Sequence, residues 1–324
     1  LAFLGLVDTD PKPRGWKLSP ARVVDFICGS RGESIRAPAS AKLPPDCPKS
    51  LVIDPKFVGN RSLIERCVVT LAGGRGLLLV GQPGTAKSMI GELLATAISG
   101  TSELTIQGTA GASEDHLRYG WNYAMLLSSG PKPSALVPSP VLTAMKTGRL
   151  VRIEEITRCL PEVQDALISI LSERWMMIPE MSGDEGSVFS APGFNVIATA
   201  NLRDRGVSEM SSALKRRFNF ETVHPIADLQ QEIELVRIRS VQTLVESGIE
   251  ATVDERLLEM LITTFRDLRN GQTAEGWTVE KPDAVMSTAE AVTVASSISC
   301  QGSFFAGDKD PVSLLPGYLL CVVL

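Results

Sequence analysis

A phosphate-binding pattern follows an apolar stretch in the first third of the chain. It reads Gly81-Gln82-Pro83-Gly84-Thr85-Ala86-Lys87-Ser88. In such a loop the backbone N–H groups and the start of the next helix face phosphate oxygens, and a lysine adds positive charge. Lys87 and Ser88 therefore predict a site for a nucleoside triphosphate, with the Ser88 hydroxyl placed to bind Mg²⁺. Ala86 stands where this pattern usually has a glycine.

Two adjacent carboxylates follow a second apolar stretch. Residues 150–153 run directly into Glu154 and Glu155. A buried strand that ends in two carboxylates can hold one beside a metal ion and the other beside an attacking water, as phosphoryl transfer requires. A solvated acidic loop is the alternative interpretation. Glu154 stands where an aspartate is usual, so its carboxylate reaches one methylene further from the backbone.

An amide and a basic cluster complete the set. Asn201 ends the apolar run 195–200, where its side chain would face the γ-phosphate of a nucleotide on a neighbouring strand. A simple turn residue is the alternative. Arg216 and Arg217 carry planar, permanent charges, and one of them could act on a neighbouring subunit's nucleotide as an arginine finger. A solvated helix face is the alternative, and it is the favoured interpretation when the cluster is taken without the other motifs.

The elements that must position these residues alternate along the chain. Short apolar strands are expected at 77–80, 104–106, 150–153 and 195–199, with helices at 63–71 and 89–99 between or beside them. This alternation predicts a parallel sheet flanked by helices.

After Pro225 the patterns are helical. We expect a helix at 229–245, a second opened by a capping box at 252–255, and a third opened by a capping box at 287–290. The predicted organisation is a proline-rich N-terminal extension (1–50), an α/β nucleotide-binding core (51–226), and a small all-helical lid with a C-terminal segment (227–324).

Composition narrows the class of protein. The 324 residues are 44% hydrophobic and 21% charged, which is typical of a globular protein with a sizeable core. A net charge of −5 argues against nucleic acid as the main partner. Six scattered cysteines favour reduced thiols and a cytoplasmic location. No apolar run reaches the ~20 residues of a membrane span. The missing initial Met and the apolar end at 314–324 indicate a fragment or joined segments.

In their order, these motifs resemble the AAA+ ATPases, and more closely their MoxR-type branch, from about Val58 to Phe220. The resemblance rests on residues 57–59, 84–88, 155–158, 161–167, 197–201 and 212–218. It implies a P-loop AAA+ parallel sheet flanked by helices and followed by a helical lid. It also implies that 108–138 is an insert and that 175–192 is a hairpin.

The resemblance implies a role for each site residue. Val58 and Gly59 would border the adenine, and Glu155 would polarise water. Asn201 would be the sensor 1 residue, and Arg217, or alternatively Arg216, would reach the neighbouring nucleotide. The remaining nucleotide contacts would come from Gln82, Pro83, Gly84, Thr85, Ala86, Lys87, Ser88 and Met89, with Ser88 and Glu154 binding Mg²⁺.

Other polar and aromatic residues are expected to be structural. A sensor 2 arginine is not evident in 286–291, and Arg266 and Arg269 are expected to be solvated. His116 and His224 are expected to have no catalytic part. Three aromatic residues of the insert are expected to pack within it rather than face a pore: Tyr119, Trp121 and Tyr123.

The function implied by the resemblance is that of an ATP-dependent remodelling ATPase. Such a protein would form a homo-oligomeric ring, hexameric in this branch, and act as a chaperone on a client with a von Willebrand A-type domain partner. One alternative is an ATP-binding assembly scaffold with little turnover, motivated by Ala86, Glu154 and the missing sensor 2 arginine. The other is a nucleic-acid-associated AAA+ motor.

Overall fold

The computed structural model describes residues 1–38, 44, 47–201, 209–250, 252–282, 286–305 and 310–323. The chain divides into two compact units. The first comprises Leu1–Gly81 and Ala86–Val223, and the second comprises Gln82–Thr85 and His224–Leu324. Among the described residues, no helix is both long enough and apolar enough to cross a membrane.

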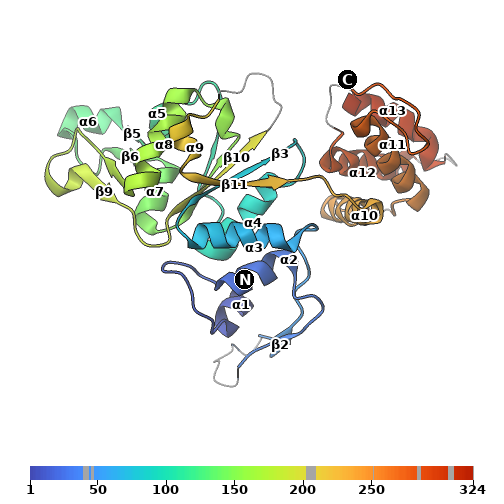
Figure 1. The fold of residues 1–324 in the computed structure, drawn as a ribbon, viewed down its shortest axis with the longest axis horizontal. Coiled ribbons are helices and arrows are strands. Elements are labelled where there is room, and N and C mark those ends of the chain that lie inside the picture. Colours follow the sequence, from blue (N-terminus) through green and yellow to red (C-terminus); the bar gives the residue numbers. More distant parts are fainter. Residues whose placement is uncertain are drawn as a thin grey trace. The chain divides into compact units, whose positions relative to one another are not determined.

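A five-stranded parallel sheet forms the centre of the first unit (Figure 1). The strands lie in the order β11-β3-β10-β7-β4. Their bounds are Gly76–Gly81 (β3), Thr105–Gln107 (β4), Leu150–Glu154 (β7), Asn195–Asn201 (β10) and Phe218–Val223 (β11). The predicted parallel sheet is confirmed, and the four predicted strands are all present within a residue or two at each end.

Strand β11 was not predicted. It lies at the sheet edge beside β3, where Phe218 pairs with Gly76 and Val223 pairs with Gly81. Phe218 and Val223 are buried, whereas Phe220 is exposed. Phe218 and Val223 are five positions apart and join the cores on opposite faces of the sheet. Polar and apolar residues alternate only from Phe218 to Glu221, as expected for a half-buried strand. The signal was therefore present, but it is weaker than the continuous apolar runs of the central strands.

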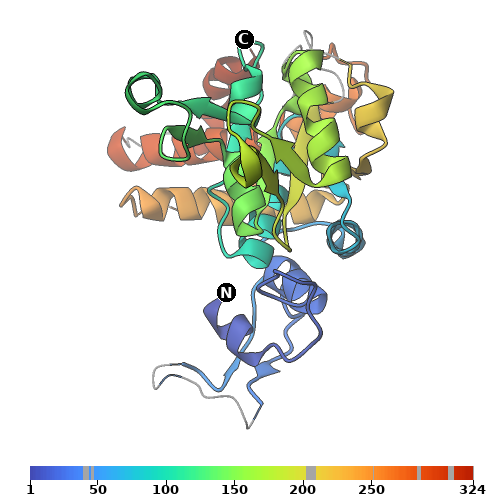
Figure 2. The ribbon, with the colours of Figure 1, turned by 90° about the vertical axis from the view of Figure 1, so that its left-hand side faces the viewer.

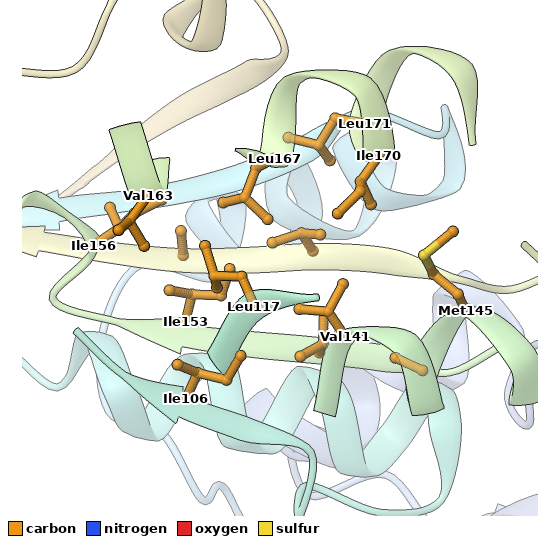
Figure 3. Close-up of a cluster of buried hydrophobic side chains, with 14 of the residues drawn as sticks. Ile106, Leu117, Val141, Met145, Ile153, Ile156, Val163, Leu167, Ile170 and Leu171 are labelled. Atoms are coloured by element: carbon orange, nitrogen blue, oxygen red, sulfur yellow. The ribbon is translucent and has the colours of Figure 1, made fainter. Parts of the chain in front are cut away.

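Helices cover both faces of the sheet. One face carries α1 (Ala2–Val7), α2 (Pro20–Cys28), α3 (Arg61–Ala72) and α4 (Lys87–Ser99), and the other carries α5 (Glu114–Leu117), α7 (Pro140–Thr147) and α8 (Pro161–Glu173). Successive side chains of β3 alternate between the two cores, since Leu77 and Leu79 join the first and Leu78 and Val80 the second. In Figure 3, Leu167 and Ile170 of α8 point toward the sheet that includes the strand of Ile153.

The first 28 residues pack into this unit. Val23 and Ile27 of α2 are fully buried in the core that contains α3 and α4, and Trp16 and Leu18 are buried beside them. Figure 2 shows this N-terminal part in dark blue, with the chain then passing through β1 (Ile35–Arg36) and β2 (Ser50–Leu51), which pair antiparallel. The segment expected to be an extension thus supplies core residues.

Two small hairpins project from the sheet connections. The insert contains β5 (Tyr119–Trp121), α6 (Tyr123–Ser129) and β6 (Leu136–Pro138), with β5 and β6 antiparallel. The second hairpin pairs β8 (Trp175–Met177) with β9 (Ser187–Phe189) across the 3₁₀ turn η2 (Gly183–Gly186). The short elements η1 (Ile156–Arg158) and α9 (Ser212–Lys215) complete the unit. The hairpin expected at 175–192 is present.

Four helices make up most of the second unit: α10 (Leu229–Glu246), α11 (Glu255–Asn270), α12 (Thr288–Phe305) and α13 (Pro311–Val323). The predicted all-helical region is confirmed. A reciprocal capping box does open α12, because Ser287 N–H donates to Glu290 and Glu290 N–H donates to Ser287 Oγ. The capping box predicted at Thr252 is wrong, since Asp254 caps α11 by accepting from the N–H groups of Arg256 and Leu257.

The expectation that Arg266 and Arg269 are solvated is wrong. Both guanidinium groups donate to the Glu232 carboxylate at 2.8 Å, and Glu232 is only 1% exposed. Thr288 donates to the same carboxylate, so α10, α11 and α12 meet at this one group. A buried carboxylate needs such partners because desolvation would otherwise penalise its charge. Helical periodicity alone does not reveal that α10 brings a carboxylate beside these arginines.

Candidate functional site

The candidate site residues gather at the carboxyl edge of the sheet. Register pairs Asn201, at the end of β10, with Gly81, at the end of β3. The same strand β10 pairs on its other side with β7, which ends at Glu154. The carboxyl ends of parallel strands are where ligands bind in open α/β sheets. The fold therefore places the chain's phosphate loop, paired glutamates and terminal asparagine on three adjacent strands.

The loop that follows β3 is fixed by its own hydrogen bonds. Lys87 begins α4, is buried, and donates its ammonium to the Gly81 carbonyl at 3.2 Å. Thr85 donates its hydroxyl to the Gln82 carbonyl at 2.8 Å. These bonds hold the turn closed at both ends. In general, the first N–H groups of a helix lack an acceptor within the helix, which makes a helix start such as that of α4 a favourable place for an anion.

Ala86 adopts a left-handed backbone conformation, with φ 64° and ψ 21°, directly before α4. A Cβ in this region costs about 1–2 kcal/mol, which explains why glycine is usual here. The alanine side chain packs against the core that contains α4. Burial of this methyl group partly offsets the backbone strain, so the departure from glycine is compatible with the same loop shape.

The carboxylate of Glu154 joins three polar side chains. Ser88 and Thr199 donate their hydroxyls to Glu154 Oε2 at 2.7 and 2.8 Å. Arg152 donates to the other oxygen, Oε1, at 2.9 Å. The longer glutamate side chain therefore still brings its carboxylate against the serine that follows Lys87. Arg152 and Glu154 lie two residues apart in β7 and so on the same face of the sheet.

Glu155 leaves β7 in a left-handed conformation with φ 53°. Its N–H donates to Thr199 Oγ1 at 2.9 Å, and its carboxylate forms an ion pair with Arg158 at 2.7 Å. Thr199 thus fixes both glutamates, one through its carboxylate and the other through its backbone. We did not single out Thr199 from the sequence, although it lies two residues before Asn201 and faces the same side of β10.

Oxygen ligands for a magnesium ion are present at this edge. The Ser88 hydroxyl and the Glu154 carboxylate already touch, and hydroxyl and carboxylate oxygens suit this hard cation. In the part of the chain that the structure describes, no group of three or more His, Cys, Asp or Glu side chains could hold a metal by itself. This donor set fits an ion that takes its remaining ligands from phosphates and water.

The two arginines after α9 differ in their surroundings. Arg217 is half-buried and donates to Ser172 Oγ at 2.7 Å and to the Ala213 carbonyl at 2.8 Å. Arg216 is exposed, and within the described residues its guanidinium makes no hydrogen bond or ion pair. Arg217 is therefore committed inside its own chain, whereas Arg216 is available to another molecule.

Other residues singled out from the sequence lie elsewhere. Val58 is half-buried and Gly59 is exposed in the segment before α3, and no described contact ties them to the loop. His116 Nδ1 accepts from Ser113 N–H and caps the short helix α5, which is the structural part expected.

The aromatic residues of the insert separate into two kinds. Tyr119 and Trp121 pack edge to face at 6.1 Å between ring centroids, as expected. Tyr119 also donates to Glu180 at 2.9 Å, and burial followed by this hydrogen bond raises the pKa of Tyr119 to about 12. Tyr123 is 72% exposed, so the expectation that it packs within the insert is wrong. It begins α6, which buries none of its residues.

Comparisons with known proteins agree with this architecture. A family model described as an AAA domain of the dynein-related subfamily matches residues 76–218, and one described as a YehL-like AAA+ ATPase C-terminal domain matches residues 230–324. The protein YehL of Escherichia coli (strain K12) is 50% identical over 307 residues, which cover 94% of this chain and 79% of YehL. The protein YojN of Bacillus subtilis (strain 168) is 27% identical over 227 residues, or 67% of each chain.

The fold also matches solved structures at low sequence identity. NtrX from Brucella abortus in complex with ATP superposes with a TM-score of 0.54 at 11% identity, covering 82% of this chain and 55% of NtrX. This likeness supports the fold alone, whereas the match to YehL extends over nearly the whole chain. The chain therefore belongs to the AAA+ ATPases, in their YehL-like group.

Proposed function

We propose that this chain hydrolyses ATP as a subunit of a homo-oligomeric AAA+ ring. The observation that carries the proposal is the contact between Ser88 and Glu154 at 2.7 Å, beside the buried Lys87. The groups proposed to bind phosphate, bind the metal and orient water follow three adjacent strands of one sheet. A structural hydrogen-bond cluster alone would not need a buried lysine at the start of α4 and two consecutive carboxylates at the end of β7.

Each site residue has a proposed part. Backbone groups of Gln82 to Met89 bind the triphosphate, and Lys87 neutralises its β and γ oxygens. Ser88 and Glu154 would hold Mg²⁺, which when bound would supply positive charge against the triphosphate. Glu155 orients and deprotonates the attacking water, and Asn201 holds that water in line. Val58 and Gly59 are proposed to border the adenine.

The proposed site is completed by a neighbouring subunit. Arg216, rather than the internally bonded Arg217, would reach the γ-phosphate of the next copy. Such an arginine raises turnover by about 10³–10⁵-fold. The activity should therefore appear only when subunits associate, which links ring formation to hydrolysis.

The work done by the ring is proposed from its resemblance to MoxR-type proteins. In that reading the chain is a cytoplasmic chaperone that remodels or matures a partner complex, together with a von Willebrand A-type domain protein. The net charge of −5 argues against a nucleic-acid motor. Copurification of the tagged chain in ATP and in ADP, followed by identification of bound proteins, tests for such a partner.

Hydrolysis rate against protein concentration tests the shared site. We expect the rate per subunit to rise steeply over the range in which light scattering shows subunits assembling, and to level off once rings form. Lys87→Ala should remove both nucleotide binding and the ATP-dependent part of assembly. A rate per subunit that is the same for monomers and assembled rings would overturn the shared-site proposal.

An ATP-binding scaffold with little turnover is the second candidate. Two ion pairs favour it: Arg152 pairs with Glu154, and Arg158 pairs with Glu155. If these pairs persist with nucleotide bound, assembly would depend on ATP but hydrolysis would be slow. ATP-dependent assembly together with equal, near-zero rates for the wild type and Glu155→Gln would favour this candidate.

A further inference from the structure

Arg75 lies just before β3, at the opposite end of that strand from the phosphate loop. Its guanidinium donates from Nη2 to the backbone carbonyls of Arg216 and Phe218, the latter at 3.4 Å. Its Nε donates to the side-chain oxygen of Asn219 at 2.8 Å. One side chain therefore binds three acceptors within four consecutive residues, and those residues include Arg216.

We infer that Arg75 is a positioning residue that sets the backbone of Arg216 for the neighbouring subunit's nucleotide. This inference rests on the proposed function. Arg75 does not touch the nucleotide in this account. It acts through the peptide segment that carries Arg216, whose own side chain has no partner within the described residues.

The backbone next to Arg75 adds a further hydrogen bond to the same segment. Gly76 N–H donates to the Arg217 carbonyl at 3.2 Å, so the carbonyls of residues 216, 217 and 218 are all bound by residues 75 and 76. A Cβ on Gly76 would lie 2.8 Å from the Phe218 ring, which is too close for any side chain. The close approach of the two segments therefore depends on glycine at this position.

The backbone of Arg75 is in turn bound by a buried side chain. Asn195 is 2% exposed, and its amide donates to the Arg75 carbonyl at 2.9 Å. On the other side, the bonds of Arg217 to Ser172 and Ala213 fix the residue next to Arg216. Arg216 thus has its carbonyl bound by Arg75 and is followed in the chain by the internally bonded Arg217.

The acceptors of Arg75 are not carboxylates. Within the described residues Arg75 binds two backbone carbonyls and one amide oxygen, all in residues 216–219. A planar fork that reaches two carbonyls and an amide also fixes orientation in a way that a single ammonium cannot.

Arg75→Ala is the main test, measured by steady-state ATP hydrolysis of assembled protein. We expect kcat to fall by roughly 10- to 100-fold, because a displacement of about 1 Å at a catalytic group costs up to about 100-fold. KM should stay within about twofold of wild type, since the nucleotide contacts of the same subunit are intact. Arg75→Lys keeps the charge but not the fork, so its kcat should also fall.

Arg66→Gln is the matched control. Arg66 is also an exposed arginine that fastens β11 by three hydrogen bonds, but it binds the Glu221 carboxylate rather than the Arg216 segment. We expect its kcat to stay within about twofold of wild type. Melting temperatures of all variants check that the fold is retained, and Arg75→Lys carries the test if Arg75→Ala does not fold.

Mixed rings separate an effect on the neighbour from an effect within the subunit. Glu155→Gln subunits keep Arg75 and Arg216, so they can complete the site of an adjoining Arg75→Ala subunit. The mixture should then hydrolyse ATP faster than either variant alone, as should the mixture of Glu155→Gln with Arg216→Ala. Recovery with Arg216→Ala but not with Arg75→Ala would show that Arg75 acts in its own subunit and would overturn the inference.

The two proposals fail in different ways. If wild type hydrolyses ATP and Arg75→Ala matches it, the inference about Arg75 is wrong and the proposed function stands. If wild type does not hydrolyse ATP, or if no mixture regains activity, the shared-site function fails and the inference fails with it.

Discussion

Ser88 and Glu154 are 66 positions apart in the chain, yet the Ser88 hydroxyl donates to the Glu154 carboxylate at 2.7 Å. The contact joins the first turn of α4 to the end of β7. It brings together two oxygen ligands that a magnesium ion accepts. The sheet register, rather than local sequence, is what makes them neighbours.

Glu154→Gln should weaken the binding of magnesium rather than the binding of nucleotide. The amide keeps the size of the side chain but removes the charge that would face the ion. We expect the Mg²⁺ concentration for half-maximal hydrolysis to rise by roughly tenfold, about 1.4 kcal/mol. Titration of ATPase rate with Mg²⁺ measures this.

Ser88→Ala provides the paired comparison. It removes the hydroxyl of the same contact and should shift the magnesium requirement in the same direction. A double variant that shifts it no further than either single variant would show that the two residues act on one ion. An unchanged magnesium curve in both single variants would contradict the metal assignment.

Arg216→Ala should impair turnover, whereas Arg217→Ala should impair stability. Arg216 is exposed and uncommitted, so its removal should lower turnover by about 10³-fold or more with little change in thermal stability. Arg217 loses two internal hydrogen bonds, which should cost about 1–3 kcal/mol of unfolding free energy. Turnover and urea unfolding, measured on the same preparations, would reveal a reversed pattern if the assignment is wrong.

Among the ionic side chains of the second unit, Glu232 should be the one whose removal lowers the free energy of unfolding most. Glu232→Ala leaves Arg266 and Arg269 without their buried partner, and such a loss costs about 3–5 kcal/mol. Glu234 lies on the same helix but pairs with Arg237 at the surface, so Glu234→Ala should cost less than about 1 kcal/mol. Chemical unfolding of both variants tests this contrast, and equal losses would contradict it.

The cysteines should differ in reactivity. Cys67 is buried in α3, and desolvation by burial raises the pKa of its thiol to about 12. Cys321 is exposed on α13. At pH 8 a thiol reagent should label Cys321 in the native protein and reach Cys67 only after unfolding. Labelling of Cys67 at the rate of an exposed thiol would contradict the packing of α3.

The raised pKa of Cys67 also makes the free energy of unfolding depend on pH. The unfolded thiol loses its proton above its ordinary pKa of 9.0, whereas burial raises the pKa of the folded thiol to about 12. Its contribution is therefore complete below pH 9 and is lost as the pH rises toward 12. Between pH 8 and 10, wild type should lose about 1 kcal/mol more stability than Cys67→Ala.

Sequence patterns predicted the elements whose signals are local. Buried parallel strands are short continuous apolar runs, and the phosphate loop, paired glutamates and Asn201 each follow one of them. The order of these motifs was enough to recognise the AAA+ family, and the fold bears this out.

Long-range pairings could not be read in the same way. Nothing in the local sequence distinguishes Thr199 or Arg75. Their parts become visible only when the folded sheet brings Thr199 to Glu154 and Arg75 to Arg216. Arg266 looked solvated because its partner Glu232 lies 34 residues away on another helix. Strand β11 alternates apolar and polar residues only from Phe218 to Glu221, which is too short a pattern to stand out beside the central strands.

Steady-state ATP hydrolysis by wild type and Glu155→Gln, at a concentration that supports rings, tests the central claim most directly. We predict measurable turnover for wild type, a loss of about 100-fold or more for Glu155→Gln, since general base catalysis contributes about 10²–10⁴-fold, and unchanged ATP affinity in both. Equal rates for the two proteins, with ATP bound to both, would contradict the account.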